Sequence, residues 1–109
     1  MEDKVVELQA DSVVFFSPRD EAHFFAWLDQ MACVVEVVGR GRIIYIKVDR
    51  RRVDADALRD ILAFFQRYRI AMAQLRAFDS ESFSSWFRRS DTYWYHRVFG
   101  SRTSQGVGT

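Results

Sequence analysis

Two apolar, β-prone runs flank the turn-forming tetrapeptide Gly39-Arg40-Gly41-Arg42. Pairing Val38 with Ile43 gathers the aliphatic side chains of both runs on one face, whereas a slip of one residue would bring Glu36 onto that face. The expected apolar face consists of Cys33, Val35, Val37, Ile44, Ile46 and Val48. The sequence therefore predicts a hairpin, one face of which other elements must cover.

A second hairpin is predicted nearer the amino terminus. The β-prone runs 5–8 and 13–16 are separated by the turn formers of residues 9–12. Pairing Leu8 with Val13 also pairs Val6 with Phe15, which again gathers apolar side chains on one face. A single bent strand is the alternative interpretation of this segment.

Two amphipathic helices are predicted to cover the sheet. Ser17 is a suitable N-cap and Pro18 fits the first helical position, while Asp54 is a suitable N-cap for a second helix. Each cap precedes apolar residues at the spacing i, i+3, i+4, i+7, which is one helical stripe. The stripes are Phe24, Trp27, Leu28 and Met31 in the first helix, and Leu58, Ile61, Leu62 and Phe65 in the second.

The last third of the chain is expected to form short helices and a tail. Three short helical segments are predicted between residues 70 and 100, and Gly100 is a natural terminator for the last. Residues 101–109 lack periodicity, and we expect them to be disordered. The predicted fold is one α+β domain over residues 1–100. In it, a four-stranded, mainly antiparallel sheet in ββαββα order packs on two long helices, with a helical C-terminal third.

Composition narrows the classes of function. The formal net charge of +1 gives no global field that attracts nucleic acid, and the single cysteine excludes an internal disulfide. The amino terminus lacks the basic start and apolar stretch of a signal peptide, and no run approaches the roughly 20 apolar residues that span a bilayer. We therefore expect a cytoplasmic protein with no membrane partner.

No constellation of residues predicts catalysis. Two histidines and one cysteine cannot form the usual Cys/His zinc centre. His96 and Asp91 do not share a helical face, because neighbours on a helix are three or four residues apart. Asp54 and Asp56 are explained by the start of a helix, where acidic groups stabilise the helix dipole. We therefore expect a protein that is not an enzyme and has no metal or cofactor.

Aromatic residues are concentrated in residues 86–100, which hold six of the seventeen in the chain. Three adjacent rings cannot all face one core, so at least one should lie at the surface, where Tyr, Trp and Arg are enriched in interface hot spots. The predicted partner-binding residues are Tyr93, Trp94, Tyr95, Arg88, Arg89 and Arg97. Another protein or a second copy of the chain, as in a homodimer, is the expected partner.

In format, although in no motif, such a domain resembles small bacterial interaction proteins, a class that includes immunity proteins. That resemblance implies a module that binds another protein and possesses no catalytic centre. An immunity protein directed against a nuclease is often strongly acidic, and this chain is not.

Nucleic-acid binding is the alternative function. Arginines with interleaved aromatic residues can hold phosphates while bases stack on the rings. The candidate residues are Arg50, Arg51, Arg52, Arg40 and Arg42. The two clusters lie at opposite ends of one predicted strand, about 25 Å apart. Asp49 and Asp54 also flank the triple arginine and neutralise it, so we rank this function second.

Overall fold

The computed structural model describes residues 4–100. The tail predicted for residues 101–109 lies outside the described residues. The chain divides into two compact units, and the boundary between them lies after Ile70.

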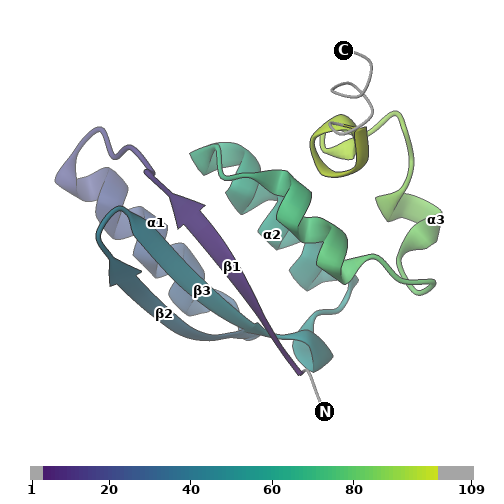
Figure 1. Ribbon diagram of the computed structural model, residues 1–109, viewed down its shortest axis with the longest axis horizontal. Helices are drawn as coiled ribbons and strands as arrows, with labels where there is room; N and C mark the ends of the chain where they lie inside the picture. Colours follow the sequence, from purple (N-terminus) through teal and green to yellow (C-terminus); the bar gives the residue numbers. More distant parts are fainter. Residues whose placement is uncertain (1–3, 101–109) are drawn as a thin grey trace. The chain divides into compact units, whose positions relative to one another are not determined.

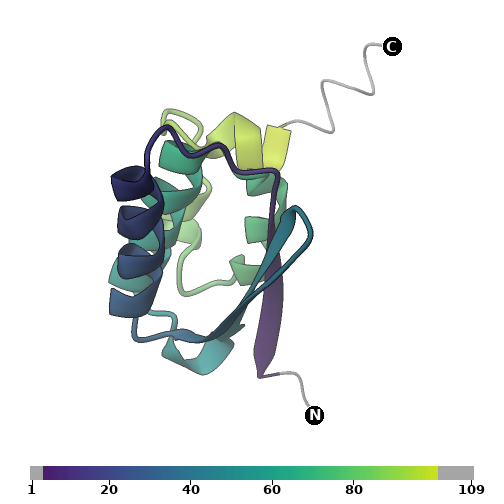
Figure 2. The same ribbon diagram turned by 90° about the vertical axis from the view of Figure 1, so that its left-hand side faces the viewer.

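The first unit is a two-layer α+β arrangement (Figures 1 and 2). Its elements are β1 (Val5–Asp11), α1 (Pro18–Gln30), β2 (Val34–Arg40), β3 (Ile43–Asp49), the short 3-10 helix η1 (Arg50–Arg52) and α2 (Ala55–Tyr68). The strand order is β1-β3-β2, and β3 is antiparallel to both neighbours. β1 and β2 are therefore parallel, and α1 connects them while β3 lies between them, which makes a split βαβ unit.

The predicted four-stranded sheet on two long helices is wrong, because the described sheet has three strands and several short helical segments accompany α1 and α2. β1 does not turn at residues 9–12. It continues to Asp11, and Ala10 is fully buried opposite Ile44. The strand ends at Ser12, which has a φ of 58° and donates its backbone N–H to the carbonyl of Arg42 at 2.8 Å.

Residues 13–16 form a loop that connects β1 to α1 rather than a strand. Phe15 packs on Phe24 with ring centroids 5.1 Å apart, whereas Val14 and Phe16 are exposed. The β-prone run that predicted a second strand therefore lies in a loop, in which residues 13 and 15 are partly buried and residues 14 and 16 are exposed. A burial pattern with a period of two indicates which side of a segment faces the core. It does not indicate whether the segment pairs with another strand.

The β2–β3 hairpin has a register two residues away from the predicted one. Val38 pairs with Tyr45 and Arg40 with Ile43, so the turn is Gly41-Arg42 rather than the whole tetrapeptide. Gly41 has a φ of +61° at the first central position, as a type II′ turn requires. A shift of two keeps Val37 and Glu36 on their predicted faces, so the apolar pattern could not separate the two registers.

A β-bulge alters the predicted apolar face at the start of β2. The register shifts between Val34 and Glu36, which leaves Val35 half exposed instead of facing the core. Cys33 is buried just before the strand, and its carbonyl accepts the backbone N–H of Asp49 at 2.8 Å. The bulge is a local backbone feature that side-chain alternation does not reveal.

The core of the first unit lies between the sheet and both helices. Leu8 and Ile46 of the sheet, Leu28 of α1 and Phe65 of α2 surround a residual cavity of only about 10 Å³. Ser17 and Asp54 cap the two helices, as predicted. The helices are also joined by a hydrogen bond, because the Trp27 indole N–H donates to Asp60 at 3.0 Å.

The second unit begins at Ala71, and its described part, residues 71–100, contains three short helical segments (Figure 1). They are the 3-10 helix η2 (Met72–Phe78), α3 (Ser84–Phe87) and the π-helix η3 (His96–Gly100). The fully buried Phe87 packs edge-on against Phe99 with centroids 5.0 Å apart, and Trp86 packs edge-on against Trp94 at 5.8 Å. Large rings therefore supply much of the packing in these short helices.

The turn geometry makes a prediction that separates the two registers. Gly41→Ala should lower the free energy of unfolding by about 1 kcal/mol, because a Cβ atom disfavours positive φ. Gly39→Ala is the matched control, since its φ is not positive and no atom lies within 4 Å of the Cβ position. Urea denaturation measures both variants. Equal losses of stability for the two substitutions would contradict the two-residue turn.

Candidate functional site

The structure places the three adjacent aromatic residues in different environments. Trp94 is only 8% exposed, and its indole N–H donates to the carbonyl of Phe87 at 2.8 Å. Tyr93 is 53% exposed and packs edge-on against Trp94, and Tyr95 is half-buried against Phe99. Trp94 is thus an interior residue, and Tyr93 is the ring of the three that is most open to solvent.

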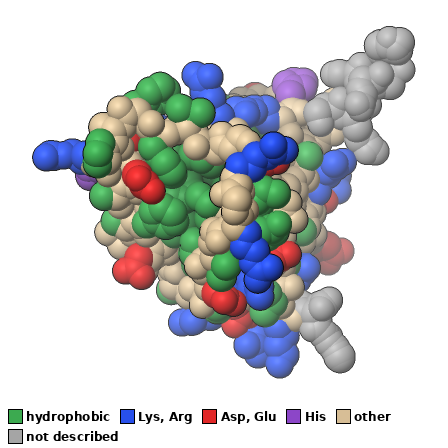
Figure 3. Space-filling view, turned by 60° about the vertical axis from the view of Figure 1, so that its left-hand side comes forward, with side chains coloured by type: hydrophobic (Ala, Val, Ile, Leu, Met, Phe, Trp, Pro, Cys, Tyr) green, Lys and Arg blue, Asp and Glu red, His purple; other side chains and the backbone are tan. Residues whose placement is uncertain are grey.

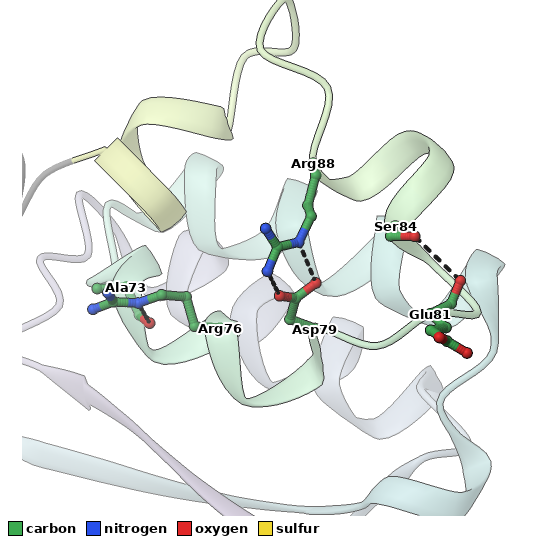
Figure 4. Close-up of polar contacts among 6 residues, drawn as sticks. All are labelled: Ala73, Arg76, Asp79, Glu81, Ser84 and Arg88. Carbon is green, nitrogen blue, oxygen red and sulfur yellow. Dashed lines mark hydrogen bonds and ion pairs between the residues drawn. The ribbon is translucent and has the colours of Figure 1, made fainter.

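Two of the three arginines predicted for this segment hold carboxylates of the second unit. The Arg88 guanidinium binds Asp79 through two hydrogen bonds, the Nε bond being 3.1 Å long (Figure 4). Arg89 binds Asp91 in the same bidentate way, at 3.1 and 2.6 Å, and thereby lowers the pKa of that carboxyl. Arg97 is exposed. Arg88 and Arg89 are therefore already engaged in bidentate ion pairs within the second unit.

The predicted nucleic-acid-binding arginines are also partly neutralised. Arg51 binds Asp49 through Nε and a terminal nitrogen at 3.1 and 3.0 Å, and its backbone N–H donates to the same carboxylate at 3.0 Å. The hydrogen bond from the Arg51 side chain is the main cause of a lowered pKa at Asp49. Arg42 pairs with Asp11 at 3.1 Å. Arg40, Arg50 and Arg52 are exposed.

Neither a metal centre nor a reactive thiol is indicated by the described residues. No three His, Cys, Asp or Glu side chains in residues 4–100 are grouped so that they could hold a metal ion. Cys33 is 1% exposed, and burial raises the pKa of its thiol, which disfavours the reactive thiolate. No helix in the same range has both the length and the apolar character needed to cross a bilayer.

A surface that the sequence analysis missed lies at one end of the first unit. The loop between β1 and α1 and the end of α2 surround a hollow of about 490 Å³. Val14 and Phe16 on its rim are 64% and 89% exposed, the highest values among the large hydrophobic residues described. We name this region the Phe16 surface, and define it by Val14, Phe16, Arg67, Tyr68 and Arg69.

The backbone of Phe16 is fixed although its ring is in solvent. Ser17 accepts the backbone N–H of Asp20 at 3.1 Å, and the Asp20 carboxylate in turn accepts the backbone N–H of Phe16 at 2.9 Å. An apolar residue before the N-cap often packs on an apolar residue at the fourth helical position. That position is Glu21 here. Phe16 therefore lacks the apolar helix partner that usually covers such a ring.

Phe15 anchors the same loop from the inner side. Its ring lies 5.1 Å from Phe24, 6.4 Å from Phe25 and 6.5 Å from Tyr68, measured between centroids. Tyr68 belongs both to this aromatic cluster and to the wall of the hollow. Burial raises the pKa of the Tyr68 hydroxyl. The exposed ring of Phe16 thus follows directly on the half-buried ring of Phe15.

The rim of the Phe16 surface is basic. Arg67 and Arg69 are exposed, and neither makes an ion pair with another residue in the range 4–100. Asp20 is the carboxylate that lines the hollow, and it already accepts the Phe16 hydrogen bond. The chain also holds Ser12 and Arg69 at the hollow with φ values near 60°. Backbone strain of this kind clusters at functional sites.

The environments of Trp94 and Tyr93 predict different effects on stability. Trp94→Phe removes the indole donor and leaves the Phe87 carbonyl without it, so the free energy of unfolding should fall by about 1–3 kcal/mol. Tyr93→Ala removes an exposed ring with one edge contact, and should lower it by about 0.5–1 kcal/mol. Urea denaturation monitored by near-ultraviolet circular dichroism compares the variants. A larger loss for Tyr93→Ala would show that Trp94 is not the interior residue.

Comparison with protein-family models, curated proteins and solved structures finds no match to this chain. The function therefore has to be argued from the chain's own side chains. Among the surfaces described, the Phe16 surface combines the greatest exposure of an aromatic ring with a fixed backbone and cations not paired to carboxylates.

Proposed function

We propose that this chain is a non-catalytic protein-binding module that contacts its partner through the Phe16 surface. The observation that carries the proposal is the Phe16 ring, 89% exposed on a backbone held by Asp20. Keeping a phenylalanine ring in water forgoes about 1.5–3 kcal/mol of burial free energy. A protein partner that covers the ring would recover that free energy.

The composition of the Phe16 surface suits an interface. Hot spots are enriched in aromatic residues and arginine, gathered around a pocket from which the partner excludes water. Phe16, Tyr68, Arg67 and Arg69 surround the hollow in this way, and Val14 adds apolar area. Because Phe15 and Asp20 already order the loop, binding would lose less conformational entropy than a mobile loop would lose.

The charges indicate the chemistry of the partner. Two arginines line the hollow, and the carboxylate that lines it, Asp20, already accepts a hydrogen bond. The favoured partner therefore has an apolar group that enters the hollow and an Asp or Glu residue beside that group. Complementary rim charges mainly accelerate association, and salt screens their effect. A small domain that covers a partner in this way can act as an inhibitor, in the manner of an immunity protein. We propose that this chain acts in the cytoplasm.

The proposed partner-binding surface thus lies in the first unit rather than in residues 86–100. Trp94 is buried, and Arg88 and Arg89 are engaged by carboxylates. Tyr93 is the residue of that segment that combines an aromatic ring with high exposure. It therefore provides a matched control for the experiment on Phe16.

Phe16→Ala should weaken binding of the partner by about 2 kcal/mol or more, which is about 30-fold in the dissociation constant. The fold should persist, because the ring contributes little buried area. The measurement is quantitative affinity capture from the native host lysate with wild type, Phe16→Ala and Tyr93→Ala, each with and without nuclease.

A stoichiometric protein that Phe16→Ala loses, that Tyr93→Ala keeps and that nuclease treatment leaves in place would support the proposal. A set of captured proteins unchanged by Phe16→Ala would contradict it. Recovery of nucleic acid, with loss of all captured protein after nuclease, would favour the arginine run 50–52 instead. Circular dichroism of each variant excludes unfolding as the cause of a loss.

A further inference from the structure

A second apolar hollow lies in the first unit, between α1 and the edge strand β2. Its volume is about 540 Å³. Phe25 of α1 and Val35 of β2, which are 39% and 50% exposed, belong to its walls. Figure 3 shows hydrophobic side chains gathered on this side of the molecule, with both acidic and basic side chains around them. We name this hollow the α1–β2 groove.

The groove is acidic, whereas the Phe16 surface is basic. Two carboxylates, Asp29 and Glu36, line it, and its lining includes no lysine or arginine. Asp29 makes no ion pair with any residue of the described range, and Glu36 lies 3.4 Å from Lys47 with half of its side chain exposed. A matching ligand therefore presents an apolar group together with a cation.

The backbone indicates how such a ligand would enter. β2 has a neighbouring strand on one side only within the described sheet, so its other edge borders the groove. The bulge between Val34 and Glu36 interrupts that edge, and bulges of this kind disfavour the addition of a further strand. Insertion of a side chain between Phe25 and Val35 is thus favoured over extension of the sheet.

We infer that the α1–β2 groove receives the Phe16 surface of a second copy of this chain. Phe16 of one copy would pack beside Phe25 and Val35 of the other, and Arg67 or Arg69 would pair with Asp29. The inference rests on the proposed function, since it uses the same Phe16 surface and names a second copy as a partner. The two surfaces are complementary, because the Phe16 surface is apolar and basic and the α1–β2 groove is apolar and acidic.

The two surfaces are different, so the contact is heterologous. A copy that offers its Phe16 surface to one neighbour keeps its own groove open for another, which gives head-to-tail assembly. The contact inferred consists of one inserted ring and one ion pair, and small interfaces of this kind belong to the weak, transient class. Assembly should therefore depend on protein concentration and weaken with salt.

Sedimentation equilibrium tests the inference with two complementary variants. The weight-average mass of the wild type should rise with protein concentration and fall when salt is added. Phe16→Ala keeps the groove, Asp29→Arg keeps the Phe16 surface, and each alone should remain monomeric. Mixed in equal amounts, they should form one-to-one dimers and nothing larger, because each dimer has one intact contact and no second.

Glu81→Arg is the matched control, because it makes the same change of charge at an exposed residue of the second unit. It should assemble as the wild type does. Circular dichroism of all variants verifies that each is folded before its mass is interpreted.

A wild type that remains monomeric at every concentration, or a mixture that forms no dimer, would overturn the inference. If Phe16-dependent capture of a different protein persists in that case, the proposed function stands without self-association. If Phe16→Ala changes neither assembly nor capture, both proposals fail.

Discussion

Packing of Phe15 against Phe24 and Tyr68 is the contact on which the arrangement of the first unit depends. It draws the loop after β1 onto α1 and the end of α2. The chain thereby leaves the sheet at Ser12 instead of returning as a second strand. Because successive residues of an extended segment point in opposite directions, Val14 and Phe16 then face solvent. The packing of one half-buried ring thus accounts both for the three-stranded sheet and for the exposed surface beside it.

Local signals predicted the helices better than the sheet. The caps at Ser17 and Asp54 and the apolar stripes depend on nearby residues, which the sequence displays directly. The end of β1 depends on Ala10 being buried opposite Ile44, a contact between distant segments. The β2–β3 register depends on whether one or both glycines form the turn, and registers two residues apart give nearly the same faces.

The candidate site shows the same contrast between local signals and contacts that only the fold creates. The reasoning that three adjacent aromatic residues cannot all be buried is consistent with the exposure of Tyr93, yet it could not show that Trp94 is the interior ring. Phe16 has a local signal in the sequence, namely an apolar residue before an N-cap with Glu21 at the fourth helical position. The α1–β2 groove has no such signal, because Phe25 and Val35 meet only through the fold.

Amide hydrogen exchange measured by NMR on the wild type and on Phe15→Ala tests whether the Phe15 ring holds the loop between β1 and α1 in place. The Phe16 amide, which donates to Asp20, should exchange slowly in the wild type. Phe15→Ala should remove that protection, while the amide of Leu62 in the interior of α2 stays protected, because the loop opens locally. A Phe16 amide that exchanges as fast in the wild type as in Phe15→Ala, or one that stays protected in both, would contradict the account.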